Sequence, residues 1–182
     1  MKRPVTPARQ SGFTVIELSQ VLATVLVSAH LAVSSFGDMI NTTRLTTASN
    51  AMLLALKTAR AEAVKRDELI TLRKQGDGWE TGWVMFVDLN RNALLDDDEE
   101  VLLEQGAFTP GFTARGNRPV ATYISYNGEG RSVYVNGGFK AGTLTICDRT
   151  ATPAKGHARA VVISSTGRPR VSDQTKDLKT CT

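Results

Sequence analysis

A single carboxylate lies inside a long apolar stretch near the start of the chain. The stretch opens at Phe13 and continues to Phe36, and Glu17 is its one acidic residue. At the centre of a bilayer a carboxylate costs roughly 2.5–3.5 kcal/mol on insertion scales, and such groups usually mark function. Glu17 therefore needs a cationic partner if the stretch enters an apolar environment.

Two arginines near the other end of the chain are suited to binding phosphate. Arg168 and Arg170 flank Pro169, which favours an extended backbone at Arg168, so both side chains point to the same side. The guanidinium fork matches the geometry of phosphate oxygens. The alternative is a solvated hairpin whose arginines pair with Asp148 or Asp173.

The charge distribution favours an acidic partner for this end. Residues 67–108 contain eleven acidic and three basic residues, whereas residues 109–182 contain four acidic and eleven basic ones. A basic end on an otherwise balanced chain suggests nucleic acid. Further basic residues nearby in the sequence could widen the site: Arg149, Lys155, Arg159, Lys176 and Lys179. Binding of this kind is mostly phosphate contact and is salt-sensitive.

A third candidate is an acidic and amide-rich segment in the middle of the chain. Its oxygen-bearing residues occupy positions 1, 3, 5, 9 and 12 of an EF-hand-like loop: Asp88, Asn90, Asn92, Asp96 and Glu99. Ala93 replaces the glycine that makes the sharp turn in such loops, and the flanks have the pattern of strands rather than helices. A polar hairpin loop is therefore the favoured interpretation, with calcium as the alternative.

The sequence carries no recognisable catalytic or cofactor motif. It lacks a glycine-rich phosphate loop, a nucleophile elbow and a His-Glu-x-x-His helix. His30 and His157 have no cysteine or second histidine at metal-binding spacing. We therefore expect neither an enzyme nor a cofactor.

A long helix followed by strands must position these residues. Leu45, Met52, Leu56, Ala59 and Ala63 recur on one helical face, and the pattern predicts one helix from about Thr14 to Lys65 or Arg66. Residues 13–36 are long enough to cross a bilayer of about 30 Å. Period-two alternation then predicts strands at 69–72, 83–88, 100–103, 123–126, 133–135, 142–147 and 159–164. One helix followed by short strands indicates an α+β fold with an antiparallel sheet.

The start of the chain resembles the class III signal of type IV prepilins and pseudopilins. Residues 11–18 read Ser-Gly-Phe-Thr-Val-Ile-Glu-Leu, after a short positive leader with Lys2, Arg3 and Arg9. The resemblance implies that prepilin peptidase cleaves between Gly12 and Phe13 and methylates the new amino terminus. It also implies that Glu17 pairs with the terminal amine of a neighbouring subunit. The alternative is a secretory signal or a plain signal anchor.

Later blocks are similar to the FimT/GspH group of minor pilins and minor pseudopilins. They are Gly-Trp-Val-Met-Phe-Val-Asp at 82–88, Thr-Ile-Cys-Asp at 145–148, Ala-Arg-Ala-Val-Val-Ile-Ser at 158–164 and Gly-Arg-Pro-Arg-Val at 167–171. In FimT-like proteins of transformable bacteria, the matching Gly-Arg-x-Arg segment binds DNA. The resemblance thus implies contact of double-stranded DNA with Arg168 and Arg170. The alternative is a GspH-like structural pseudopilin of the type II secretion system without DNA binding.

The resemblance also implies the division of the chain. Residues 1–12 are a prepilin leader, 13–36 a hydrophobic transmembrane and filament-core helix, 37–66 its amphipathic continuation, and 67–182 a β-rich head. The expected architecture is pilin-like, with a long helix packed on a small antiparallel sheet. The expected location is the inner membrane, with a single span and a periplasmic head, and then a filament with other pilins or pseudopilins.

Both cysteines fall in that head. The positive leader predicts a cytoplasmic amino terminus and a head outside the inner membrane, where disulfides persist. A Cys147–Cys181 disulfide is therefore expected, and it would add roughly 3–4 kcal/mol in the chain-entropy model. Two free thiols are the alternative, because sequence alone does not establish pairing.

Overall fold

The computed structural model describes residues 12–148, 150, 152–154, 156–179 and 181. The chain divides into two compact units, Met1–Ile40 and Asn41–Thr182. We call the second of these the head unit. The leader before Gly12 lies outside the described residues, as do the side chains of 30–36 and 38, which include His30.

One helix, α1 (Val15–Arg66), contributes to both units, in agreement with the bounds predicted from the sequence. It ends where Asp67 adopts a left-handed backbone conformation, with φ of 55°, as residues after a helix often do. Within the part of the chain that the structure describes, no helix combines the length and the apolar character needed to cross a membrane. The predicted spanning segment, 13–36, includes the undescribed side chains of 30–36.

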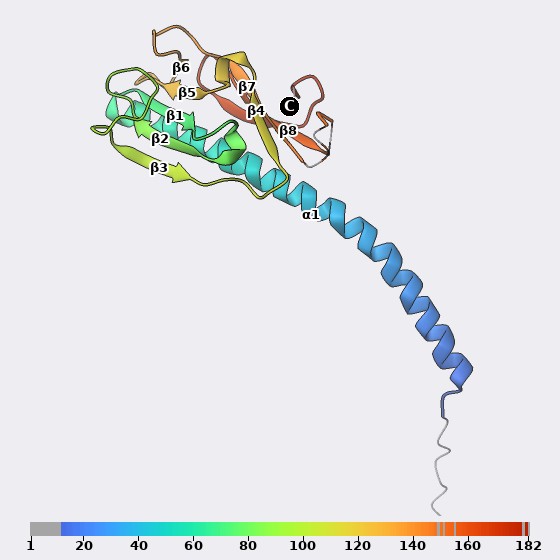
Figure 1. Ribbon diagram of the computed structural model, residues 1–182. Coiled ribbons are helices and arrows are strands. Elements are labelled where there is room, and N and C mark those ends of the chain that lie inside the picture. Colours follow the sequence, from blue (N-terminus) through green and yellow to red (C-terminus); the bar gives the residue numbers. More distant parts are fainter. Residues whose placement is uncertain (1–11, 149, 151, 155, 180, 182) are drawn as a thin grey trace, which may run out of the picture. The chain divides into compact units, whose positions relative to one another are not determined.

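The head unit is built on one face of the C-terminal part of α1. Leu45, Met52, Leu56, Ala59 and Ala63 are all fully buried, as the helical periodicity predicts. They join strand residues in one hydrophobic cluster, and Figure 1 shows this part of α1 packed against the strands. The expected α+β class is therefore confirmed.

The strands form two antiparallel sheets rather than the one small sheet expected. The first sheet has the order β3-β2-β1-β5-β6 and the second has the order β4-β7-β8-β9. The first comprises β1 (Ile70–Lys74), β2 (Trp83–Val87), β3 (Val101–Gln105), β5 (Tyr123–Tyr126) and β6 (Ser132–Val133). The second comprises β4 (Thr113–Gly116), β7 (Gly142–Cys147), β8 (Ala158–Ile163) and β9 (Pro169–Ser172). Two short 3-10 helices, η1 (Trp79–Thr81) and η2 (Arg118–Val120), complete the set.

Two strands, β4 and β9, were not among those predicted from the alternation of apolar residues. Each has only four residues and little apolar content, and β9 begins with a proline. Both are edge strands of the second sheet, where a strand needs fewer apolar contacts and tolerates proline. Their pairing with β7 and β8 is a tertiary feature that local pattern does not encode.

A disulfide attaches the C-terminal tail to the second sheet, as predicted. Cys147 at the end of β7 is bonded to Cys181, and their Cα atoms lie 5.8 Å apart. Both half-cystines are buried with Ala158, Ala160 and Leu178 in a second, smaller hydrophobic cluster. The alternative of two free thiols is excluded.

A buried lysine is an unusual element of the head core. Lys140 is fully buried, its Nζ donates to the carbonyl oxygen of Tyr123 at 2.7 Å, and Nζ lies over the rings of Tyr123 and Tyr134. Burial lowers the pKa of Lys140 to about 7. The two aromatic rings act in the opposite sense, because they stabilise the charged form.

Because the pKa of Lys140 is lowered in the folded state, we expect the head unit to become more stable as pH rises. Above pH 7 the folded state releases the Lys140 proton, whereas the unfolded state keeps it up to about pH 10.4. The unfolded state then binds more protons, so the free energy of unfolding rises, by up to about 2 kcal/mol between pH 7 and 9. Urea denaturation at these two pH values measures the rise. Lys140→Met should abolish it, and an equal rise in that variant would contradict the assignment.

Candidate functional site

Glu17 caps the first turn of its own helix. Its Oε2 accepts hydrogen bonds from the backbone N–H and from Oγ1 of Thr14, both at 2.9 Å. In return, the Glu17 backbone N–H donates to Thr14 Oγ1 at 3.3 Å. This reciprocal arrangement is a capping box, which satisfies N–H groups that a helix start leaves without partners. The capping role was not predicted from the sequence, although the Thr-x-x-Glu spacing of residues 14–17 is its known signature.

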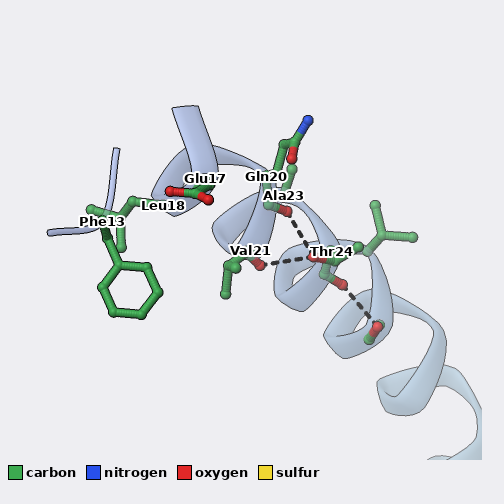
Figure 2. Close-up of a pocket in the computed structure, with 9 residues that line it drawn as sticks. Phe13, Glu17, Leu18, Gln20, Val21, Ala23 and Thr24 are labelled. Atoms are coloured by element: carbon green, nitrogen blue, oxygen red, sulfur yellow. Dashed lines mark hydrogen bonds between the residues drawn. The ribbon is translucent and has the colours of Figure 1, made fainter. Parts of the chain in front are cut away.

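The start of α1 and the residues just before it present a predominantly apolar surface. Nine large apolar side chains between Phe13 and Val27 are 58–92% exposed: Phe13, Val15, Ile16, Leu18, Val21, Leu22, Val25, Leu26 and Val27. Figure 2 shows Phe13 just before the first turn and Glu17 on it. The hydroxyls of Thr24 and Ser28 turn back to helix carbonyls, at 2.7 Å to Gln20 and 2.8 Å to Thr24. Such an extended apolar surface marks a contact with other protein or with lipid.

The β8–β9 turn presents the two predicted arginines to solvent. Ser164 and Arg168 close the turn through backbone hydrogen bonds, and the Arg168 N–H also donates to Ser164 Oγ at 3.1 Å. Arg168 and Arg170 are exposed, while Pro169 between them is half-buried. This alternation of exposure fits the extended backbone that the sequence predicts, in which both arginine side chains point to the same side.

Gly167, the first residue of the Gly-Arg-Pro-Arg segment, has no room for a side chain. Its φ is +78°, and a Cβ placed there would lie 2.0 Å from the carbonyl oxygen of Gly130. That carbonyl is itself held in place, because Arg60 of α1 donates Nε–H to it at 2.8 Å. The glycine thus lets the β8–β9 turn lie directly against the turn after β5, and this contact positions Arg168.

The two arginines lie on one side of a groove whose other side is α1. The groove has a volume of about 940 Å³ and lies wholly within the head unit. Its α1 side is lined by Lys57, Arg60, Ala61, Val64 and Lys65, and its sheet side by Val162, Ser164, Arg168, Pro169 and Arg170. None of these lining residues is acidic. We call it the basic groove, after its five cationic side chains.

Only part of the predicted basic site gathers at this groove. Arg159, Lys176 and Lys179 lie outside its lining, and Arg149 and Lys155 lie outside the described residues. The helix residues Lys57, Arg60 and Lys65 were not predicted, since they are more than 100 residues before Arg168 in the sequence. No local signal joins two segments that only the fold brings together.

Arg170 pairs with Asp177 and not with Asp148 or Asp173, the two acids considered in the sequence analysis. Arg170 Nη2 donates to Asp177 Oδ2 at 2.9 Å, and Ser172 Oγ donates to the same oxygen. Hydrogen bonds from Ser172 and Arg170 lower the pKa of Asp177. Asp148 instead pairs with the ring of His157 at 2.7 Å.

The acidic loop after β2 is held together by its own hydrogen bonds. Asp88 accepts from Thr71 Oγ1 and from the backbone N–H groups of Asn92 and Ala93. Glu99 accepts from the backbone N–H groups of Leu89 and Asp96, and the amides of Asn90 and Asn92 donate to Asp96. Among the described residues, no group of three or more His, Cys, Asp or Glu side chains is arranged to hold a metal ion. The geometry fits the polar hairpin loop favoured by the sequence.

The long helix, the two antiparallel sheets and the exposed apolar start of α1 define a pilin-like subunit. Residues 48–167 match the family model described as Type II transport protein GspH. Because this match covers more than half of the chain, the chain belongs to the GspH family. Its fold is that of the minor pilin and minor pseudopilin structures compared below. No curated protein sequence is similar enough to count as a match.

Solved structures share the fold at low sequence identity. A crystal structure of the type IV minor pilin FimU from Pseudomonas aeruginosa PAO1 matches with a TM-score of 0.59 and 19% identity, covering 76% of this chain and 95% of that one. A second crystal form of FimU gives 0.57 and 20% identity, covering 76% and 100%. The minor pseudopilin EpsH from the type 2 secretion system of Vibrio cholerae gives 0.51 and 12%, covering 71% and 97%. The predicted resemblance to FimT/GspH proteins is confirmed.

Proposed function

We propose that this chain is made as a prepilin and enters a filament through the start of α1. Prepilin peptidase cleaves between Gly12 and Phe13 and methylates the Phe13 amine. The apolar segment 13–36 holds the precursor in the inner membrane, with the head unit on the periplasmic side. In the filament the segment packs among the helices of other pilins or pseudopilins.

The observation that carries this proposal is the carboxylate at the start of an exposed apolar helix. Glu17 is surrounded along α1 by side chains that are more than half exposed in the isolated chain. Once these side chains are covered by lipid or by other helices, an unpaired carboxylate is costly. The α-amine freed at Phe13 of a neighbouring subunit is a cation that reaches the same depth. Gly12, at the cleavage site, is exposed, and a Cβ added to it would meet nothing within 4 Å.

The head unit has a second role in this proposal, as a binder of double-stranded DNA. Arg168 at the end of the β8–β9 turn and Arg170 in β9 are exposed at the edge of the second sheet. Their guanidinium groups suit phosphate oxygens. Their contacts are with the backbone of the duplex, so binding is independent of base sequence. The observation that favours a purely structural pseudopilin instead is the Arg170–Asp177 ion pair, which occupies one guanidinium.

Replacing both arginines should weaken DNA binding strongly and reduce its salt dependence. Arg168→Gln with Arg170→Gln removes two phosphate contacts, so we expect the slope of log K against log salt to fall by about two. Fluorescence anisotropy with a labelled duplex measures both quantities. Asp177→Asn, which frees Arg170, should act in the opposite direction. Equal affinity of the wild type and the double variant would leave only the structural role.

A further inference from the structure

We propose that the C-terminal part of α1 forms the second side of the DNA site, with Lys57 and Lys65 binding phosphates opposite Arg168 and Arg170. This inference rests on the proposed DNA binding and adds residues to it. The one-sided arginine site thereby becomes a groove that holds the nucleic-acid backbone between a helix and an edge strand.

The placement of charge supports a two-sided site. Lys57 and Lys65 of α1 line the same groove as the two arginines, and both lysines are exposed. Lys65 contacts Glu62 at 3.4 Å with its side chain 71% exposed, an ion pair that is weak in water. Both lysine ammonium groups are therefore accessible to an anionic ligand.

The groove is also held in place on both sides. Arg60 donates to the Gly130 carbonyl from α1, and Gly167 lies against the same carbonyl from the β8–β9 turn. The turn after β5 thus links the helix to the arginine segment. A preformed site of this kind loses little conformational entropy when a ligand binds.

The surfaces between the cations have a chemistry that suits a nucleic-acid backbone. The uncharged lining residues include Ala61, Val64, Val162 and Pro169, and no lining residue is aromatic or acidic. This composition suits sugar and phosphate groups and offers nothing on which a base could stack.

Lys57 and Lys65 are eight residues apart, or roughly 12 Å along the helix, while phosphates recur every ~3.4 Å of axis along each strand. The pair can therefore reach different phosphates of one strand.

The test compares two double variants of the full-length protein in detergent micelles. The helix variant is Lys57→Gln with Lys65→Gln, and the strand variant is Arg168→Gln with Arg170→Gln. The control is Arg44→Gln with Arg118→Gln, which removes the same charge at exposed residues outside the groove. Anisotropy is measured with labelled duplex and with single-stranded DNA over a range of salt concentrations, and melting curves verify folding.

We expect the helix variant to bind duplex DNA at least about fivefold more weakly than the control, with a salt slope lower by about two. Lys57→Arg with Lys65→Arg should restore both quantities. A different outcome is that the helix variant binds DNA as tightly as the control while the strand variant binds more weakly. In that case Lys57 and Lys65 do not contact the DNA, and the proposed DNA binding through Arg168 and Arg170 stands.

If the wild type binds neither duplex nor single-stranded DNA, both the proposed DNA binding and the proposed role of Lys57 and Lys65 are wrong. Salt-dependent self-association of the chain without DNA binding would have the same consequence. It would point instead to an acidic protein surface, such as residues 96–100 of a second copy, as the occupant of the groove.

Discussion

Removal of the disulfide is expected to lower the free energy of unfolding of the head unit by roughly 3–4 kcal/mol. Cys147 and Cys181 are separated by 34 residues, and their bond restricts the unfolded chain over this whole loop. The variant is Cys147→Ala with Cys181→Ala, because serine would place new hydroxyls in the buried cluster around Leu178. Urea denaturation of residues 41–182 measures the loss, since both core clusters lie entirely within this unit.

The matched control is the wild-type head unit under reducing conditions. Reduction opens the same loop without changing a side chain, so it should produce most of the same loss. The alanine variant should not respond to the reductant. A loss below about 1 kcal/mol in both experiments would contradict the stabilising role of this bond.

Gly167→Ala is expected to be the other strongly destabilising change, at roughly 2–5 kcal/mol. Alanine at a positive φ costs about 1–2 kcal/mol, and forcing a methyl group into an occupied space costs about 1–3 kcal/mol more. The occupied space is specific, because the added Cβ would lie 2.0 Å from the Gly130 carbonyl oxygen. The β8–β9 turn must then move away from the turn after β5, which displaces Arg168, so the basic groove should lose DNA affinity as well.

Gly137→Ala is the control that separates the two costs. Gly137 has a similar φ of +87°, but nothing lies within 4 Å of the position of its Cβ. Its alanine variant should lose only the roughly 1–2 kcal/mol that the backbone conformation costs. Equal losses for the two variants, measured by urea denaturation, would show that the contact between the turns is unimportant.

The elements with strong local signals could be predicted from the sequence. The apolar face of α1 repeats over several turns, Gly142–Cys147 alternates between polar and apolar residues, and Trp83–Val87 is continuously apolar. The cysteine pairing followed from the expected compartment. In contrast, β9 could not be found, because proline and arginine are poor strand signals and an edge position compensates for them.

Of the basic groove, only the arginine side could be predicted from the sequence, because only that side has a local signal. Arg168 and Arg170 are two residues apart, so their common direction follows from the local backbone. Lys57 and Lys65 reach the same groove only because α1 packs beside the second sheet. The capping role of Glu17, in contrast, has a local signal in the Thr-x-x-Glu spacing of residues 14–17.

The two roles of Glu17 can be separated by substitution. Glu17→Gln keeps a side chain that can complete the capping box but removes the charge. Thr14→Ala keeps the charge but removes the cap, at a cost of about 1 kcal/mol of helix stability. If the charge pairs with the Phe13 amine of a neighbour, only the first variant should fail to assemble.

The most direct measurement is the amount of this protein in the sheared filament fraction of a host with working pilin processing, detected by mass spectrometry of its N-terminal peptide. We predict that the wild type and Thr14→Ala yield a peptide that begins at N-methylated Phe13. Glu17→Gln should be cleaved in the membrane but be at least about tenfold depleted from filaments, which corresponds to an ion pair of about 1.4 kcal/mol or more. A wild-type protein that retains Met1, or Glu17→Gln incorporated as well as the wild type, would contradict the account.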